Sequence, residues 1–93
     1  MDIYLKFLEG RDVIATLLLI FEFGVLSRKE LMEYIGVGNR ALSDRTGVLK
    51  KQQLITGKTN MTLTPRGKFI ATHLHNMNFY LSGGKRTEGG DKE

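Results

Sequence analysis

The sequence predicts a mainly α-helical domain with one small β-hairpin, an α+β fold. Apolar residues recur at helical spacing in several segments, whereas strict alternation of apolar and polar residues is confined to a short stretch around residue 61. The chain has 93 residues, which is room for one domain. It contains no cysteine, so neither a disulfide nor a thiolate metal site can support the fold.

The first predicted helix spans residues 13–23, with Asp12 as its candidate N-cap and Gly24 at its end. It is apolar nearly all round, because only Thr16 and Glu22 interrupt it. A helix without a polar face is buried on several sides. We therefore expect it at the centre of the domain, or shared with another subunit. Residues 2–8 fit either a short strand or a helical turn.

The second helix is predicted from a capping box, because Ser27 and Glu30 stand three residues apart before an apolar stretch. It should end near Ile35 and bury Leu31, Tyr34 and Ile35. Residues 36–38 (GVG) predict a tight turn in which both glycines can take positive φ.

A third helix is expected from residue 39 to 52 or 53, with Leu42 and Leu49 facing inward. Gly47 in its middle costs about 1 kcal/mol relative to alanine, and its missing side chain would permit the close approach of a neighbour.

A hairpin and a final helix complete the predicted domain. Residues 54–56 predict one strand, 57–60 a turn, and 61–64 a half-buried strand. Thr64 and Pro65 are typical of a helix start, and an apolar stripe continues to residue 81. Residues 82–93 are rich in glycine and charge, which indicates a flexible polar tail.

The positive charge is concentrated in the middle of the chain. The net charge is +4, but residues 27–68 hold nine Lys and Arg against three Asp and Glu. The first 26 residues carry a net −2 and the last 25 are neutral. A basic segment of this kind favours an anionic partner.

Three stretches resemble winged helix-turn-helix proteins of the MarR/PadR-like kind: residues 26–31 (LSRKEL), 49–55 (LKKQQLI) and 63–68 (LTPRGK). The last is like the LTxxGK that follows the family's wing. The family usually has glycine where this chain has Gln53. The resemblance implies a domain over 1–81, with the helix-turn-helix at about 27–53, the wing at about 54–64 and a dimerisation helix at about 65–81. A chain of this length is similar to the small single-domain regulators of archaea and their viruses.

What the resemblance implies is sequence-specific binding of double-stranded DNA by a homodimer, with helix 39–52 in the major groove. The base-contacting candidates are Asn39, Arg40, Ser43 and Asp44. Arg40 is the first choice for a guanine, since a guanidinium pairs with O6 and N7. Asn39 could pair with adenine or cap the helix. Asp44 could accept from cytosine or pair with Arg40 or Arg45, and a structural ion pair is expected for Arg45.

Further cations are candidates for phosphate contacts, which fix register without reading sequence: Arg28, Lys29, Lys50, Lys51, Lys58 and Arg66. Family members are usually dimers joined through their first and last helices. The chain offers more apolar residues in these helices than one small core needs, and the candidate interface comprises Leu17, Phe21, Phe69, Leu74, Met77, Tyr80 and Leu81. A two-fold dimer predicts a pseudo-palindromic DNA site.

Other functions are disfavoured. His73 and His75 are two residues apart, so on a helix they point in different directions and cannot chelate one metal ion. The longest apolar stretch has nine residues, against the ~20 that cross a bilayer, so we expect a soluble, cytoplasmic protein without a membrane partner. No nucleophile or carboxylate pair indicates an enzyme, and no cofactor is expected. The alternative function is a winged-helix module that binds another protein of a transcription or replication complex.

Overall fold

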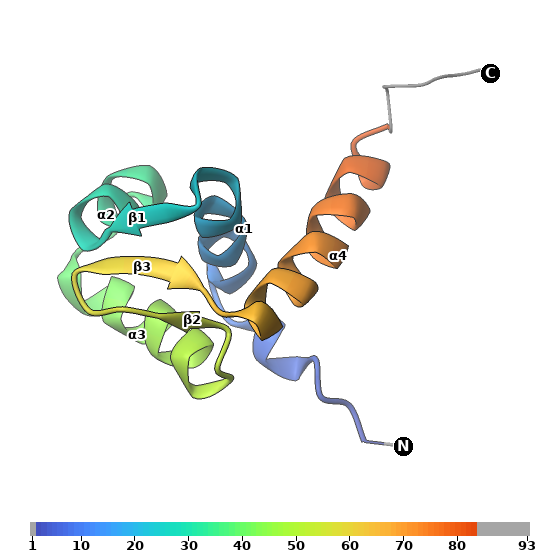
Figure 1. Ribbon diagram of the computed structural model, residues 1–93, viewed down its shortest axis with the longest axis horizontal. Coiled ribbons are helices and arrows are strands. Elements are labelled where there is room, and N and C mark those ends of the chain that lie inside the picture. Colours follow the sequence, from blue (N-terminus) through green and yellow to red (C-terminus); the bar gives the residue numbers. More distant parts are fainter. Residues whose placement is uncertain (1, 84–93) are drawn as a thin grey trace.

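A computed structural model describes residues 2–83 and contains four α-helices and a three-stranded antiparallel sheet in that range (Figure 1). This confirms the mainly α-helical fold class with a small hairpin. The elements in chain order are a short 3-10 helix η1 (Lys6–Glu9), α1 (Val13–Phe23), β1 (Val25–Ser27), α2 (Arg28–Ile35), α3 (Asn39–Lys51), β2 (Ile55–Thr56), β3 (Asn60–Leu63) and α4 (Pro65–Leu81). Residues 84–93, most of the expected tail, lie outside the described range.

Helix α1 occupies the centre of the domain, as its apolar sequence predicts. It contacts η1, the other three helices, β1 and β3. Leu17 and Ile20 are fully buried and join a core that includes Leu31, Leu42, Leu49 and Met61. Leu17 therefore has no surface to offer a second subunit, which corrects its place among the interface candidates.

Asp12 precedes α1 as expected, but its side chain does not cap the helix. The residue takes a left-handed conformation with φ 59°, and its carbonyl oxygen accepts the Thr16 hydroxyl at 2.6 Å. This geometry turns the Asp12 carboxylate away from the first N–H groups of α1 and towards Arg45 of α3. The capping prediction was wrong because a partner distant in sequence holds the carboxylate.

The sheet has one strand that the sequence did not indicate. Strand β1 pairs with β3, which also pairs with β2, so that the order is β1-β3-β2. Three residues are too few to show alternation, and β1 forms because Leu26 pairs with Met61 and packs into the core. The Arg28 N–H then donates to the Thr59 carbonyl at 2.9 Å, which fixes the tip of the hairpin beside the start of α2.

The predicted capping box at the start of α2 is confirmed. The Glu30 N–H donates to the Ser27 hydroxyl at 3.1 Å, and the Ser27 N–H donates to the Glu30 carboxylate at 2.8 Å. Tyr34 was expected to be buried, but its side chain is 55% exposed. Its ring stacks on Phe23, which is itself exposed at the surface, instead of entering the core. In the turn that follows, Gly36 has φ 78°, whereas Gly38 has an ordinary φ of −83°.

Helix α3 ends at Lys51 with Gln52 as C-cap, and the next residue, Gln53, is left-handed with φ 62°. The Gln53 N–H donates to the Lys50 carbonyl and the Leu54 N–H to the Leu49 carbonyl, the hydrogen bonds of a Schellman motif. This explains why glycine is usual at this position in the family that the sequence resembles. A side chain in this conformation costs free energy that glycine avoids.

Gln53→Gly should therefore stabilise the fold by about 0.5–1 kcal/mol, because relief of left-handed strain exceeds the added entropy of the unfolded chain. Urea unfolding of the variant and the natural chain measures the difference. A lower unfolding midpoint for the glycine variant would show that Gln53 is not strained.

Helix α4 begins with Thr64 as N-cap, since the Gly67 N–H donates to the Thr64 hydroxyl at 2.9 Å, and the same hydroxyl donates to the Gln53 carbonyl at 2.7 Å. Its first turns pack on the domain, and its later turns run away from the body towards the C-terminus (Figure 1). Gly67 and Ala71 are buried, whereas Tyr80 is 82% exposed. Among residues 2–83, no helix combines the length and the hydropathy needed to cross a membrane.

Candidate nucleic-acid interface

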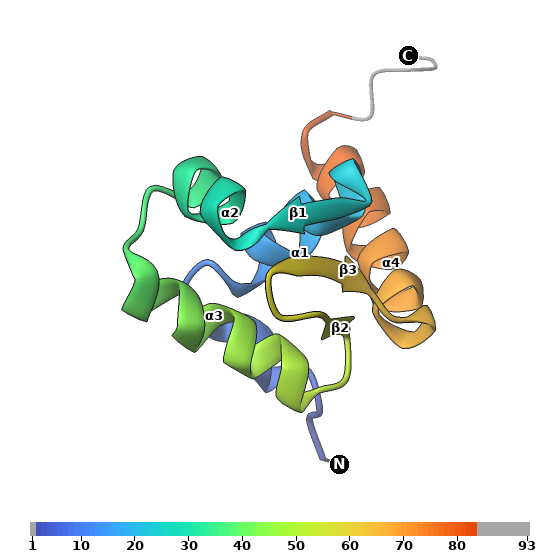
Figure 2. The ribbon, with the colours of Figure 1, turned by 60° about the vertical axis from the view of Figure 1, so that its left-hand side comes forward.

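Helix α3 has one buried and one open side. Leu42, Thr46 and Leu49 are buried against the core. Figure 2 shows α3 at the outside of the molecule beside the β2–β3 hairpin. The side turned away from the core exposes four polar residues in its first half and two lysines at its end: Asn39, Arg40, Ser43, Asp44, Lys50 and Lys51. The structure thus places all four base-contacting candidates on one open surface.

Two of these candidates are held by a third residue from α2. The Arg28 guanidinium donates to the Asn39 side-chain oxygen from Nε at 3.0 Å and from Nη2 at 2.7 Å. Nη2 also donates to the Asn39 carbonyl at 3.0 Å and to the Ser43 hydroxyl at 2.7 Å. Arg28 therefore joins α2 to the first turns of α3. Sequence reasoning assigned it only a phosphate contact, because contacts 11 and 15 residues away leave no local signal.

Asn39 is the first residue of α3, and Gly38 occupies the N-cap position. The Asn39 side chain makes no capping hydrogen bond, so the helix-capping alternative for this residue is wrong. Arg40 and Asp44 are exposed, and within residues 2–83 neither takes part in a hydrogen bond or ion pair with another side chain. Their polar groups are free for a partner.

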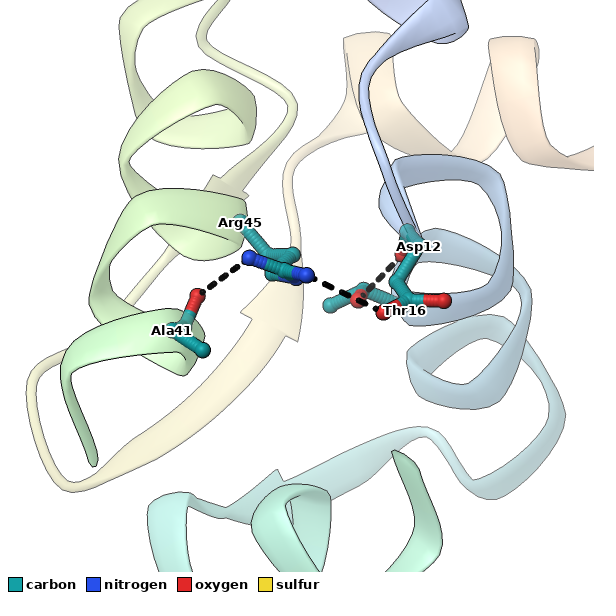
Figure 3. A network of polar contacts seen from close by, with 4 residues as sticks. All are labelled: Asp12, Thr16, Ala41 and Arg45. Atoms are coloured by element: carbon teal, nitrogen blue, oxygen red, sulfur yellow. Dashed lines mark hydrogen bonds and ion pairs between the residues drawn. The ribbon is translucent and has the colours of Figure 1, made fainter. Parts of the chain in front are cut away.

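Arg45 lies on the inner side of α3, as expected for a structural ion pair (Figure 3). Its Nη2 is 3.2 Å from the Asp12 carboxylate, and its Nη1 donates to the Ala41 carbonyl at 3.2 Å. Only 14% of the Arg45 side chain is exposed. Arg45 therefore pairs with Asp12 instead of Asp44, which leaves Asp44 open, and it ties α3 to the start of α1.

The phosphate candidates other than Arg28 are all exposed and lie around α3. Lys29 is in the first turn of α2, and Lys58 is in the hairpin tip that the Thr59 carbonyl anchors to the same turn. Lys50 and Lys51 are at the opposite end of α3. Arg66 is in α4 and lines a groove with Gln52, just beyond the end of α3. Positive charge therefore lies beyond both ends of the polar surface. The sequence selected these cations, but it did not indicate that Lys58 lies beside the start of α2, because β1, which brings the hairpin there, was not predicted.

The two histidines are separated, as their spacing predicts. His73 Nδ1 is 2.9 Å from the Phe69 carbonyl, and the His75 ring contacts Phe21. The part of the chain that the structure describes contains no cluster of three or more His, Cys, Asp or Glu that could hold a metal ion.

Helices α2 and α3, joined by a tight turn and followed by a β-hairpin that forms a three-stranded sheet with β1, define a winged helix-turn-helix fold. The chain is similar in structure to ZitR of Lactococcus lactis, solved as a doubly substituted variant in apo form, with a TM-score of 0.64 and 18% sequence identity. The match covers 90% of this chain and 74% of that one. No family model and no curated protein matches the sequence. The similarity to ZitR shows the winged-helix fold.

Proposed function

We propose that this chain binds double-stranded DNA sequence-specifically as a homodimer and regulates transcription. The observation that carries the proposal is the division of α3, which buries Leu42, Thr46 and Leu49 and exposes Asn39, Arg40, Ser43 and Asp44. An α-helix with such a polar side fits the major groove, where each base pair presents a distinct set of donors and acceptors. The fold shared with ZitR supports the same proposal.

Arg40 is the proposed reader of a guanine, because its guanidinium is exposed and no side chain among residues 2–83 holds it. Asp44 would accept from a cytosine N4 group. Lys29 and Lys58 at one end, and Lys50 and Lys51 at the other, would hold phosphates on either side of the groove. The β2–β3 hairpin would lie along the backbone as the wing, and Arg66 would add a contact beyond α3.

The proposed dimer is formed through α4. Phe69, Met77, Tyr80 and Leu81 are between 57% and 84% exposed, so they present apolar surface along a helix that leaves the body of the domain. Phe21 and Leu74 are half-buried beside this surface. Burial of this surface by a second copy would be favourable at about 25 cal/mol per Å².

Leu81→Glu together with Tyr80→Glu should convert the chain to a monomer, since each subunit would have to bury two charges at the interface. Sedimentation equilibrium of the full chain measures the change. Tyr34→Glu is the matched control, because it charges an exposed ring on α2 and should leave the dimer intact. A monomeric natural chain, or a dimer unaffected by the double change, would contradict an interface on α4.

Selection of bound sequences from random duplex DNA tests the proposed function. We expect a pseudo-palindromic consensus with half-site centres about 10 bp apart, which reflects two α3 helices one turn of DNA apart. Recovery of random sequences at an affinity that does not depend on sequence would contradict it. A chain that binds no DNA would favour the alternative, a winged-helix module that binds a protein partner.

A further inference from the structure

We propose that Arg28 is a positioning residue that converts Asn39 into a reader of guanine in place of adenine. This inference rests on the proposed function, because it names the base that the same surface selects. It concerns a residue of α2 that acts on DNA specificity through its contacts with α3.

The hydrogen bonds of Arg28 saturate the acceptor of the Asn39 side chain. Asn39 Oδ1 receives N–H groups from Arg28 Nε at 3.0 Å and from Nη2 at 2.7 Å. Nη2 has two hydrogens for its three acceptors, so one hydrogen is shared. A carboxamide oxygen has two lone pairs, and an N–H group of Arg28 faces each of them. What remains of the Asn39 side chain is its NH₂ group, which can only donate. An asparagine without this arrangement would keep both a donor and an acceptor.

Ser43 is biased in the same direction. Its hydroxyl oxygen accepts from Arg28 Nη2 at 2.7 Å, which leaves the hydroxyl hydrogen to donate outward. Arg40 beside it carries donors alone. Asn39 and Arg40 thus offer donors alone on this surface. Ser43 can donate and keeps one lone pair, and Asp44 accepts.

The major-groove edges of the bases determine what such a surface can read. Asparagine reads adenine by accepting from N6 while it donates to N7, and this needs the oxygen that Arg28 occupies. Guanine presents two acceptors, N7 and O6, which suit a donor-only side chain. The Asn39 position should therefore select guanine, and the adenine N6 group would meet no acceptor there.

The position of Arg28 is fixed by the fold. It is the first residue of α2, directly after the Ser27 capping box, and its own N–H donates to the Thr59 carbonyl at 2.9 Å. Its side chain is partly buried between the two helices. With Nε and Nη2 bound to α3, only Nη1 of the guanidinium remains for a phosphate.

The test is selection from random duplex DNA with four forms of the full chain. Asn39→Ala identifies the base position that depends on Asn39, where we expect guanine for the natural chain. Arg28→Ala frees the Asn39 oxygen, so the preference for guanine over adenine at that position should fall by about tenfold. Lys29→Ala is the control, an adjacent exposed cation, which should weaken all sequences equally without changing the preferred base.

A second variant keeps the test decisive if Arg28→Ala loses structure. Asn39→Asp retains an acceptor for Arg28 but removes both donors, so it should melt no lower than the natural chain and lose the guanine preference. The inference is overturned if Arg28→Ala and Asn39→Asp keep the natural preference, if adenine is selected at the Asn39 position, or if Asn39→Ala relaxes no position. A natural chain that enriches no sequence at all would instead overturn the proposed function.

Discussion

Replacing Gly67 by alanine is expected to destabilise the domain by about 3 kcal/mol, because Gly67 in the first turn of α4 packs directly against the backbone of Leu54. A Cβ at position 67 would lie 1.8 Å from the Leu54 carbonyl oxygen and 2.8 Å from its carbon. Leu54 cannot retreat, since its oxygen accepts the Thr64 N–H at 3.0 Å and its side chain is buried in the core. The start of α4 would have to move instead, away from its cap and from α1.

Thermal unfolding followed by circular dichroism measures this effect, and the melting temperature should fall by roughly 12–24 °C for a domain of this size. Gly47→Ala is the matched control. A Cβ at position 47 meets nothing within 4 Å among the described residues, so alanine should stabilise α3 by up to about 1 kcal/mol. Equal effects of the two substitutions would contradict the close contact of α4 with Leu54.

Raising the salt concentration from 50 to 200 mM should weaken DNA binding by about 10³–10⁵-fold if the proposed dimer makes six to ten phosphate contacts. The exposed cations around α3 would supply these contacts, and each would release a counterion from the DNA on binding. Affinity on one duplex over a salt series gives the slope of the logarithmic plot. A slope near zero would contradict DNA binding through this surface.

Substitutions separate the interface from the rest of the chain. Lys51→Ala should lower the slope by about 2 for a dimer, since each subunit loses one contact. Lys68→Ala is the control, because Lys68 is equally exposed but lies in α4 and is not one of the candidates for a phosphate contact. Equal changes for the two variants would show that the salt dependence reflects total charge alone.

Features with a local cause could be predicted from the sequence. The capping box at Ser27, the N-cap at Thr64 and the central helix α1 follow from residues a few positions apart or from composition along one helix. The structural ion pair of Arg45 was also expected, since its place on α3 turns it inward.

Features that depend on residues distant in sequence could not be predicted. Strand β1 exists because Leu26 pairs with Met61, and its three residues carry no pattern of their own. The sequence predicts a capping role for Asp12 because nothing near it in sequence indicates Arg45 as a partner. The link from Arg28 to Asn39 and Ser43 was missed for the same reason, although all three residues were separately selected as candidates. The sequence pattern identified the polar side of α3, but only the fold determines which of its donors and acceptors are already used within the chain.

The central claim, that α3 reads bases, is tested most directly by comparing Arg40→Ala with Lys51→Ala on DNA libraries randomised at each position of the selected site. Arg40→Ala should relax one base position in each half-site, at a cost of about 1–3 kcal/mol for the natural sequence. Lys51→Ala should weaken binding to all sequences about equally. An unchanged base preference in Arg40→Ala, with affinity lowered uniformly as in Lys51→Ala, would contradict the account.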